Sequence, residues 1–155
     1  MNISLITIGE KMPHWVNEAY QDYSKRLRQD CQLKLLDLPA IKRTKNADLA
    51  KIKDHESDKL IQAIPKGDWV VALEVKGQSW STEKLSEKMS QWMQQGQHVS
   101  LLIGGPEGMN EQCRQRADQL WSLSQLTLPH PMVRVIVAEQ LYRAWSIIKN
   151  HPYHR

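Results

Sequence analysis

The sequence predicts an α/β domain with a mostly parallel sheet flanked by helices. Three observations predict this fold. Short apolar runs alternate along the chain with segments in which apolar residues recur at helical spacing. Several runs are almost continuously apolar, as expected of strands that are covered on both faces. No repeat, linker or low-complexity segment divides the chain, so residues 1–155 are expected to form one domain.

Strand and helix positions follow from composition and from local start and stop signals. Five strands are predicted, at residues 2–9, 32–39, 68–75, 98–105 and 122–129. Helices are predicted to begin at Pro13, at Asn46 or Asp48, at Ser81 or Thr82, at Asn110 and after the pair His130–Pro131. The first helix is expected to run to about Arg28. The fourth is expected to carry Cys113, Ala117, Leu120 and Trp121 on one side.

The last helix, within residues 132–150, is apolar around much of its first two turns. A helix of this kind is buried on more than one side. One small core is not expected to cover all of the apolar surface of this helix, which includes Val133, Val135, Ile136 and Val137. The pattern therefore suggests contact with a second copy of the chain.

Charge and cysteine content restrict the partners and the compartment. The chain has 21 basic and 17 acidic residues, a formal net charge of +4, which mildly favours a polyanionic partner. Cys31 and Cys113 are far apart and have no C-x-x-C partner, so they are expected to be reduced core residues of an intracellular protein, with no metal. No stretch approaches about 18 apolar residues and the N-terminus lacks a basic leader, so a cytoplasmic protein without a membrane span is expected.

The segment LLIGGPEGMN (101–110) places three glycines and a proline at the end of a buried strand. It matches neither G-x-G-x-x-G nor a phosphate-binding loop ending in Gly-Lys-Ser/Thr. The glycines serve either a tight strand-to-helix turn or a slot in which a flat ligand lies against the backbone. We favour the slot. Residues 73–77 and 126–131 also follow strands, so three strand ends are expected to meet at one pocket.

Two further segments each allow a structural and a functional interpretation. SLSQLTLP (122–129) is either a buried strand stopped by a proline, or a rigid backbone edge that reads an adenine while Leu123, Leu126 and Leu128 enclose it. The basic clusters 25–28 and 42–45 are either solvated or in contact with phosphates. The absence of G-x-S-x-G, H-E-x-x-H and suitably spaced acid pairs excludes serine hydrolases, zincins and glycosidases.

The tail NHPYHR (150–155) is either a solvated terminus or a site for chemistry. Arg155 suits a phosphate, Tyr153 can stack on a base, and His154 can transfer a proton near neutral pH. A metal shared by His151 and His154 is disfavoured because no carboxylate or thiol is near them in the sequence.

Several segments of the sequence resemble a known family. LLIGGPEG, SLSQLTLPHPMVRVIVAEQLYRAWSI and NHPYHR, together with TIGEKMPHWV and KRTKNAD, are similar to the ribosomal RNA large subunit methyltransferase H family of the SPOUT superfamily. The resemblance covers essentially the whole chain. It implies a homodimer and a deep trefoil knot in the C-terminal part of the sheet.

The resemblance also implies the reaction. The methyl donor would be S-adenosyl-L-methionine, and the acceptor would be N3 of a pseudouridine in the helix 69 loop of 23S rRNA, as free RNA or in the ribosome. The cofactor would contact Leu73, Gly104, Gly105, Leu123, Ser124, Gln125, Leu126, Thr127 and Leu128. Tyr153, His154 and Arg155 would form the catalytic RNA site.

N3 of the base carries an imide proton that must leave before or during methyl transfer. Candidate bases are His154, Tyr153 and, through solvent, Glu139, with His154 ranked first. Arg155, Arg143 and Arg134 would balance phosphate charge or stabilise the imidate oxygens. The rival interpretation is an RNA- or ribosome-binding module without enzymatic activity. A nucleotide-binding regulator is disfavoured because no loop supplies phosphate-binding chemistry.

Overall fold

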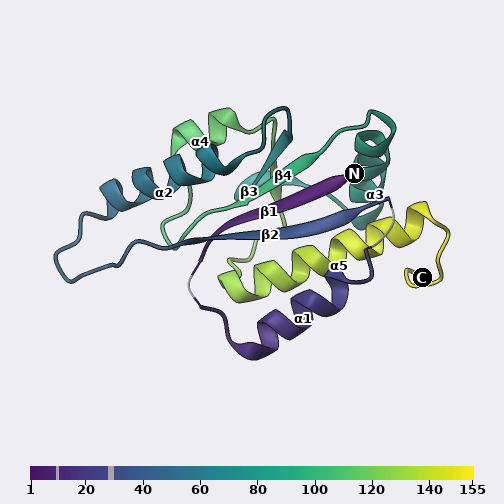
Figure 1. Ribbon diagram of the computed structural model, residues 1–155, viewed down its shortest axis with the longest axis horizontal. Coiled ribbons are helices and arrows are strands. Elements are labelled where there is room, and N and C mark those ends of the chain that lie inside the picture. The colour runs from purple at the N-terminus through teal and green to yellow at the C-terminus, as the bar shows by residue number, and fades with distance from the viewer. Residues whose placement is uncertain (10, 28–29) are drawn as a thin grey trace.

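The computed structural model describes residues 1–9, 11–27 and 30–155. Within them a parallel sheet has the strand order β2-β1-β4-β3-β5. Figure 1 labels β1 to β4 of this sheet. The strands are β1 (Asn2–Gly9), β2 (Gln32–Pro39), β3 (Trp69–Ser79), β4 (Val99–Ile103) and β5 (Gln119–Ser122). The helices are α1 (His14–Ser24), α2 (Leu49–Ala63), α3 (Thr82–Gln94), α4 (Glu111–Arg116) and α5 (His130–Ile148). The α/β fold with a parallel sheet flanked by helices is therefore confirmed.

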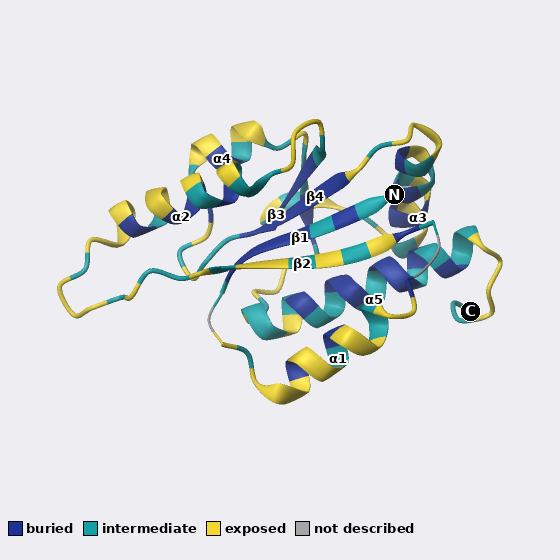
Figure 2. Cartoon of the chain, viewed as in Figure 1, coloured by how far each residue is buried: buried dark blue, intermediate teal, exposed yellow. Residues whose placement is uncertain are grey.

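Helices cover both faces of the sheet, because the central strands are apolar on both sides. In β1, Ile3 and Leu5 pack into the apolar cluster beneath α1, α3 and α5, whereas Ile6 and Ile8 pack into the cluster beneath α2 and α4. All four are at most 1% exposed. Burial also differs between strands: β4 is buried throughout, whereas the edge strand β2 is largely exposed (Figure 2).

Helices α1 to α4 begin at the predicted signals. Helix α5 begins at His130 and not after Pro131, because a proline fits in the first turn of a helix. Asp48, Ser81 and Asn110 each accept a hydrogen bond from the backbone N–H three residues further on. Pro13 precedes α1, as predicted. That helix ends at Ser24, and the predicted end at Arg28 lies outside the described residues.

The fifth strand lies earlier than predicted. Instead of residues 122–129, β5 comprises Gln119–Ser122, so Leu120 and Trp121 belong to a strand and not to the helix that contains Cys113. Asp118 explains the difference, because its carboxylate accepts from the Val70 N–H and its own N–H donates to the Val70 carbonyl. These bonds align the chain with β3 immediately after α4.

Beyond Ser122 the chain is a loop. Ser122 donates its hydroxyl to the Ser124 carbonyl, and the Ser124 hydroxyl accepts from the Leu126 N–H. These local bonds replace strand pairing. Residues 123–129, predicted as strand, therefore form the connection from β5 to α5.

Strand β3 is longer than predicted and β4 is shorter. β3 runs to Ser79, but its pairing with β5 shifts register between Leu73 and Gln78. Gly77 permits this irregularity, since a Cβ there would lie 2.7 Å from the Leu120 carbonyl carbon. β4 ends at Ile103, which leaves the glycines of residues 104–108 outside the sheet.

Both cysteines are buried and unpaired, which confirms their predicted place in the core. Among the described residues, no helix has the length and apolar character needed to cross a membrane. The same residues contain no cluster of three or more His, Cys, Asp or Glu side chains arranged to hold a metal ion.

Candidate binding sites at the carboxyl edge of the sheet

The carboxyl ends of β4 and β5, together with residues 73–75 in the middle of β3, surround a cavity of about 200 Å³, here called the β3–β5 cavity. Eight of the nine residues predicted to contact a cofactor line it: Leu73, Gly104, Gly105, Leu123, Ser124, Leu126, Thr127 and Leu128. Gln125 is exposed and is not among the lining residues. Leu126 is 72% exposed, so it stands at the rim and does not enclose the cavity as predicted.

Contacts within the protein already require the glycines at the end of β4. A Cβ on Gly104 would lie 2.8 Å from the Gly108 carbonyl carbon, and one on Gly105 would lie 2.6 Å from Glu56 Oε1. Gly108 has a φ of +80° and donates its N–H to the Gly105 carbonyl at 2.9 Å. The tight turn and the cavity therefore depend on the same residues.

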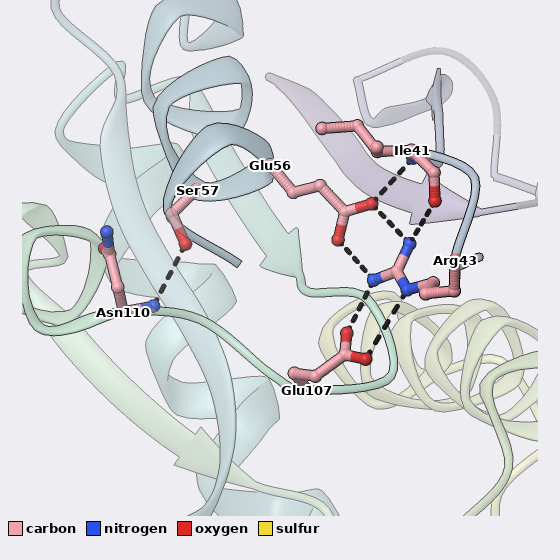
Figure 3. Close-up of polar contacts among 6 residues, drawn as sticks. All are labelled: Ile41, Arg43, Glu56, Ser57, Glu107 and Asn110. Carbon is pink, nitrogen blue, oxygen red and sulfur yellow. Dashed lines mark hydrogen bonds and ion pairs between the residues drawn. The ribbon is translucent and has the colours of Figure 1, made fainter. Parts of the chain in front are cut away.

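Arg43 holds this loop to the rest of the molecule (Figure 3). Its guanidinium pairs with Glu56 of α2 at 2.7 Å and with Glu107 of the loop at 2.6 Å, and it also donates to the Ile41 carbonyl. The pKa of Arg43 is raised by its hydrogen bonds to Glu56 and then to Glu107. Arg43 was a candidate for phosphate contact within residues 42–45, but here it is committed to two carboxylates.

The loop is also fixed at its far end. The Asn110 N–H donates to the Ser57 hydroxyl at 3.0 Å, and the Asn110 side chain donates to Asp54. The loop is thus attached to α2 at two points, through Arg43 at Glu107 and directly at Asn110.

A second cavity, of about 530 Å³, lies at the carboxyl ends of β1, β2 and β4 and is here called the β1–β2 cavity. It shares five lining residues with the first cavity: Ile103, Gly104, Gly105, Leu128 and Val133. Its own walls include Gly9, Met12, Pro13, Ala40 and His130. This site was not predicted from the sequence, although Gly9 is the last residue of a predicted strand and Pro13 follows it.

Arg134 lies beside the second cavity and is 1% exposed. Its guanidinium pairs with Asp37 at 3.3 Å, contacts the Thr7 hydroxyl, and lies 3.3 Å from His130 Nε2. Because arginine can only donate, His130 must accept through Nε2 and is therefore neutral. Burial, followed by the charge of Arg134, lowers the pKa of His130. Arg134 is too deeply buried to contact an RNA phosphate directly, which corrects one of its predicted roles.

The predicted RNA-site residues pack against the C-terminal half of α5. Tyr153 donates its hydroxyl to Glu139 at 3.0 Å, and Arg143 donates to the same carboxylate at 2.8 Å while its guanidinium lies 4.8 Å from the Tyr153 ring. His154 lies between Arg143 and Glu83, at 3.3 Å from each. Arg155 is exposed.

This arrangement bears on the choice of base. Burial and the hydrogen bond to Glu139 raise the pKa of Tyr153 to about 12, so its hydroxyl is protonated at neutral pH and is a poor base. His154 faces a donor, Arg143, at Nδ1 and an acceptor, Glu83, at Nε2. The lone pair that accepts a proton is therefore at Nδ1.

One chain does not bring the tail to either cavity, because Tyr153, His154 and Arg155 line neither of them. Val133 belongs to both cavities, whereas Glu139 and Arg143, which hold the tail, lie about 9 and 15 Å further along α5 at 1.5 Å per residue. The structure thus assembles the predicted cofactor residues and separates them from the predicted RNA site.

The family follows from comparison with known proteins. Residues 1–154 match the family model described as "Predicted SPOUT methyltransferase". The chain belongs to the SPOUT methyltransferase family. Two SPOUT relatives named ribosomal RNA large subunit methyltransferase H are 56% identical (Thioalkalivibrio sulfidiphilus) and 54% identical (Marinomonas sp.). Both alignments cover all of this chain, with 99% and 100% of the respective relatives. They confirm the resemblance found in the sequence.

Solved structures support the SPOUT fold. A "probable methylase family protein" from Haemophilus influenzae has a TM-score of 0.61 at 13% identity, covering 99% of this chain and 70% of that one. Ribosomal RNA small subunit methyltransferase E from Neisseria gonorrhoeae, bound to S-adenosyl methionine, has a TM-score of 0.51 at 12% identity, with coverages of 96% and 66%. At these identities the likeness concerns the fold.

Replacing Glu107 with Gln tests the attachment of the loop. Because Arg43 lowers the pKa of Glu107, their ion pair stabilises the folded protein above the ordinary carboxyl pKa and is lost as pH falls through the lowered value. We expect Glu107→Gln to reduce the free energy of unfolding in urea by about 1 kcal/mol at pH 7 and by less at about pH 3.

Glu87→Gln is the matched control, since it removes an exposed pair with Lys84 and should change little at either pH. An equal loss for Glu107→Gln at both pH values would contradict the assignment.

Proposed function

We propose that this protein transfers a methyl group from S-adenosyl-L-methionine to N3 of a pseudouridine in the helix 69 loop of 23S rRNA. The observation that carries the proposal is the gathering of eight predicted cofactor residues around one cavity. Membership in the SPOUT methyltransferase family and the names of the full-length relatives support it. With a ribosomal substrate, the expected location is the cytoplasm.

The β3–β5 cavity fits the chemistry of this cofactor. Apolar side chains such as Leu123 and Trp121 and the glycine backbone offer flat surfaces for an adenine. Among the described residues that line the cavity none is basic, which suits a ligand without phosphates. Glu74 is the one acidic side chain in that set, and it suits the net positive charge of a sulfonium amino acid. Sequence reasoning identified its neighbour Leu73 but missed Glu74.

When bound, S-adenosylmethionine would supply an electrophilic methyl group with a neutral thioether as leaving group, and the residues that line the β3–β5 cavity would hold it. The contribution of the chain is to hold the acceptor at attack distance, which is worth roughly 7–11 kcal/mol in well-oriented reactions. His154 accepts the imide proton through Nδ1 once that atom leaves Arg143. Exposed Arg155, together with Arg143, attracts the RNA backbone.

A homodimer reconciles the cavity with the distant tail, since a second subunit can place its own tail beside the cavity of the first. The surface of α5 supports this arrangement. Met132 is 39% exposed, and Val133, Val135 and Ile136 are only partly covered within one chain. Residues 1–155 would act as one domain in each subunit, with the deep trefoil knot as a further part of this proposal.

The reaction is tested directly on ribosomal RNA. Mass mapping of 23S rRNA from cells that lack the protein should show an unmethylated helix 69 pseudouridine. Incubation with the pure protein and S-adenosylmethionine should then add one methyl mass at N3 of that nucleotide. An rRNA that gains no methyl group, as free RNA, large subunit or assembled ribosome, overturns the proposed function.

The role of Glu74 is tested by cofactor binding. We expect Glu74→Gln to weaken the affinity for S-adenosylmethionine about tenfold in titration calorimetry, because it removes the carboxylate that faces a cationic ligand; tenfold corresponds to about 1.4 kcal/mol. Glu111→Gln is the matched control, since both carboxylates pair with Arg114 but Glu111 does not line the cavity. Equal affinity losses in the two variants would show that the effect arises from Arg114.

Mixing two inactive variants tests whether the site is shared between subunits. His154→Ala lacks the proposed base, and Glu74→Lys repels the cofactor. If the tail acts on the partner's cavity, re-formed mixed dimers contain one intact site, and activity returns to a substantial fraction of wild type. If each tail serves its own chain, neither site is intact and no activity returns. A stable monomer in sedimentation at micromolar concentration would also contradict the arrangement.

A further inference from the structure

We infer that the β1–β2 cavity is the binding site for the acceptor nucleobase, a flat imide ring of the uracil type. This inference rests on the proposed function, because it assigns the second substrate of the same reaction. It names residues that the family resemblance did not assign, among them Met12, Ala40 and His130.

The position of the cavity is the first argument. Methyl transfer requires donor and acceptor atoms to approach within about 3–3.5 Å. The β1–β2 cavity shares Gly104, Gly105 and Val133 with the β3–β5 cavity. Two of these residues have no side chain, so the wall between the cavities is thin there. A ring in the second cavity therefore lies next to whatever occupies the first.

The shape and composition of the walls favour a flat ring. Pro13, Pro106, Pro129 and Pro131 all line the cavity, and proline rings are rigid apolar surfaces with a fixed φ. Met12 adds an adaptable, polarizable side chain. A nucleobase that has left its stacked position in an RNA loop needs such surfaces on both sides.

The charge around the cavity favours a ring that loses a proton. Lys11 lines it, and no acidic side chain is among its described lining residues. Arg43 also lines it, but its charge is balanced by Glu56 and Glu107. Behind Gly9 lie Asp37 and the buried Arg134, since a Cβ at that position would be 2.9 Å from Asp37 Oδ1 and 3.0 Å from Arg134 Nη2. The two are an ion pair, and the Arg134 Nε is buried without a hydrogen-bond partner among the described residues. Imidate oxygens that form at the cavity would meet the charge of Lys11.

Arg134 also fixes the geometry of the shared wall. It lies in the first turns of α5, where a cation is unfavourable for the helix dipole, and its burial requires the pair with Asp37. Through its contact with His130, which lines the cavity together with Gly104, it connects β1 and β2 to the wall that the glycine loop provides. Arg134 and His130 are thus positioning residues for the acceptor.

Filling the cavity from one wall tests the inference. Ala40→Leu adds volume at the cavity, whereas the control Ala47→Leu makes the same change in the same connection, at a comparably half-buried position that lines neither cavity. We expect Ala40→Leu to raise KM for a pseudouridine-containing helix 69 RNA at least about tenfold and to leave the affinity for S-adenosylmethionine within about twofold. Ala47→Leu should match the wild type in both.

The outcomes separate the two proposals. A wild-type protein that methylates no rRNA overturns the proposed function, and this inference with it. An active wild type with an unchanged KM in Ala40→Leu overturns only the acceptor site. A variant that loses cofactor affinity but keeps its KM for RNA shows that the cofactor, not the nucleobase, occupies the second cavity.

A crosslinking measurement needs no turnover. The probe is helix 69 RNA with 4-thiouridine at the target position, whose photoreactive sulfur lies on the ring carbon next to N3. We expect crosslinks within residues 8–13, 40–43 or 128–133, mapped by mass spectrometry on the wild-type protein without methyl donor. Crosslinks to the tail are expected in addition, since His154 faces the same ring in the proposed reaction, and the absence of any crosslink within residues 8–13, 40–43 and 128–133 would overturn the assignment.

Discussion

The ion pairs of Arg43 are the constraint on which both cavities depend. Glu56 is almost fully buried, and a buried carboxylate without a partner destabilises a protein by about 3–5 kcal/mol. That is a large part of the roughly 5–15 kcal/mol by which a domain is stable. Arg43 satisfies Glu56 and, with the same guanidinium, holds Glu107 of the glycine loop. The loop that separates the two cavities is therefore fixed by an interaction that the fold cannot easily lose.

Helix α5 provides the second constraint, because its first turns contact the two cavities and its C-terminal half contacts the tail. Its first turns give Val133 to both cavities and bury Arg134 against Asp37 and Thr7. Its C-terminal half holds the tail through Glu139 and Arg143. The tail folds back onto Glu139 and Arg143, about 9 and 15 Å along the helix from Val133, and it lines neither cavity of its own chain. In the proposed reaction the tail of a second subunit would complete the site.

The sequence predicted those parts of the structure that local chemistry determines. Capping by Asp48, Ser81 and Asn110 acts over three residues, and two-sided burial is visible in the composition of a strand. The start of β5 was missed because it depends on Asp118 pairing with Val70, 48 residues away. The β1–β2 cavity was missed for the same reason, since its walls come from four separate connections. The cofactor residues followed from the family motifs, whereas Glu74 required the structure.

The two cavities differ in charge, and this difference suits a transfer between unlike reactants. The β3–β5 cavity has Glu74 and no basic residue among its described lining side chains. The β1–β2 cavity has Lys11 and no acidic residue among its described lining side chains, and its Arg43 is already paired with Glu56 and Glu107. A cationic donor is stabilised on one side, and a ring that develops negative charge is stabilised on the other. Between them stand Gly104 and Gly105, which present only backbone. A side chain at either position would widen the separation and would also break the contacts with Gly108 and Glu56. The same absence of side chains therefore closes the turn, admits Arg43 and Glu56 to their pair, and leaves the reactants near each other.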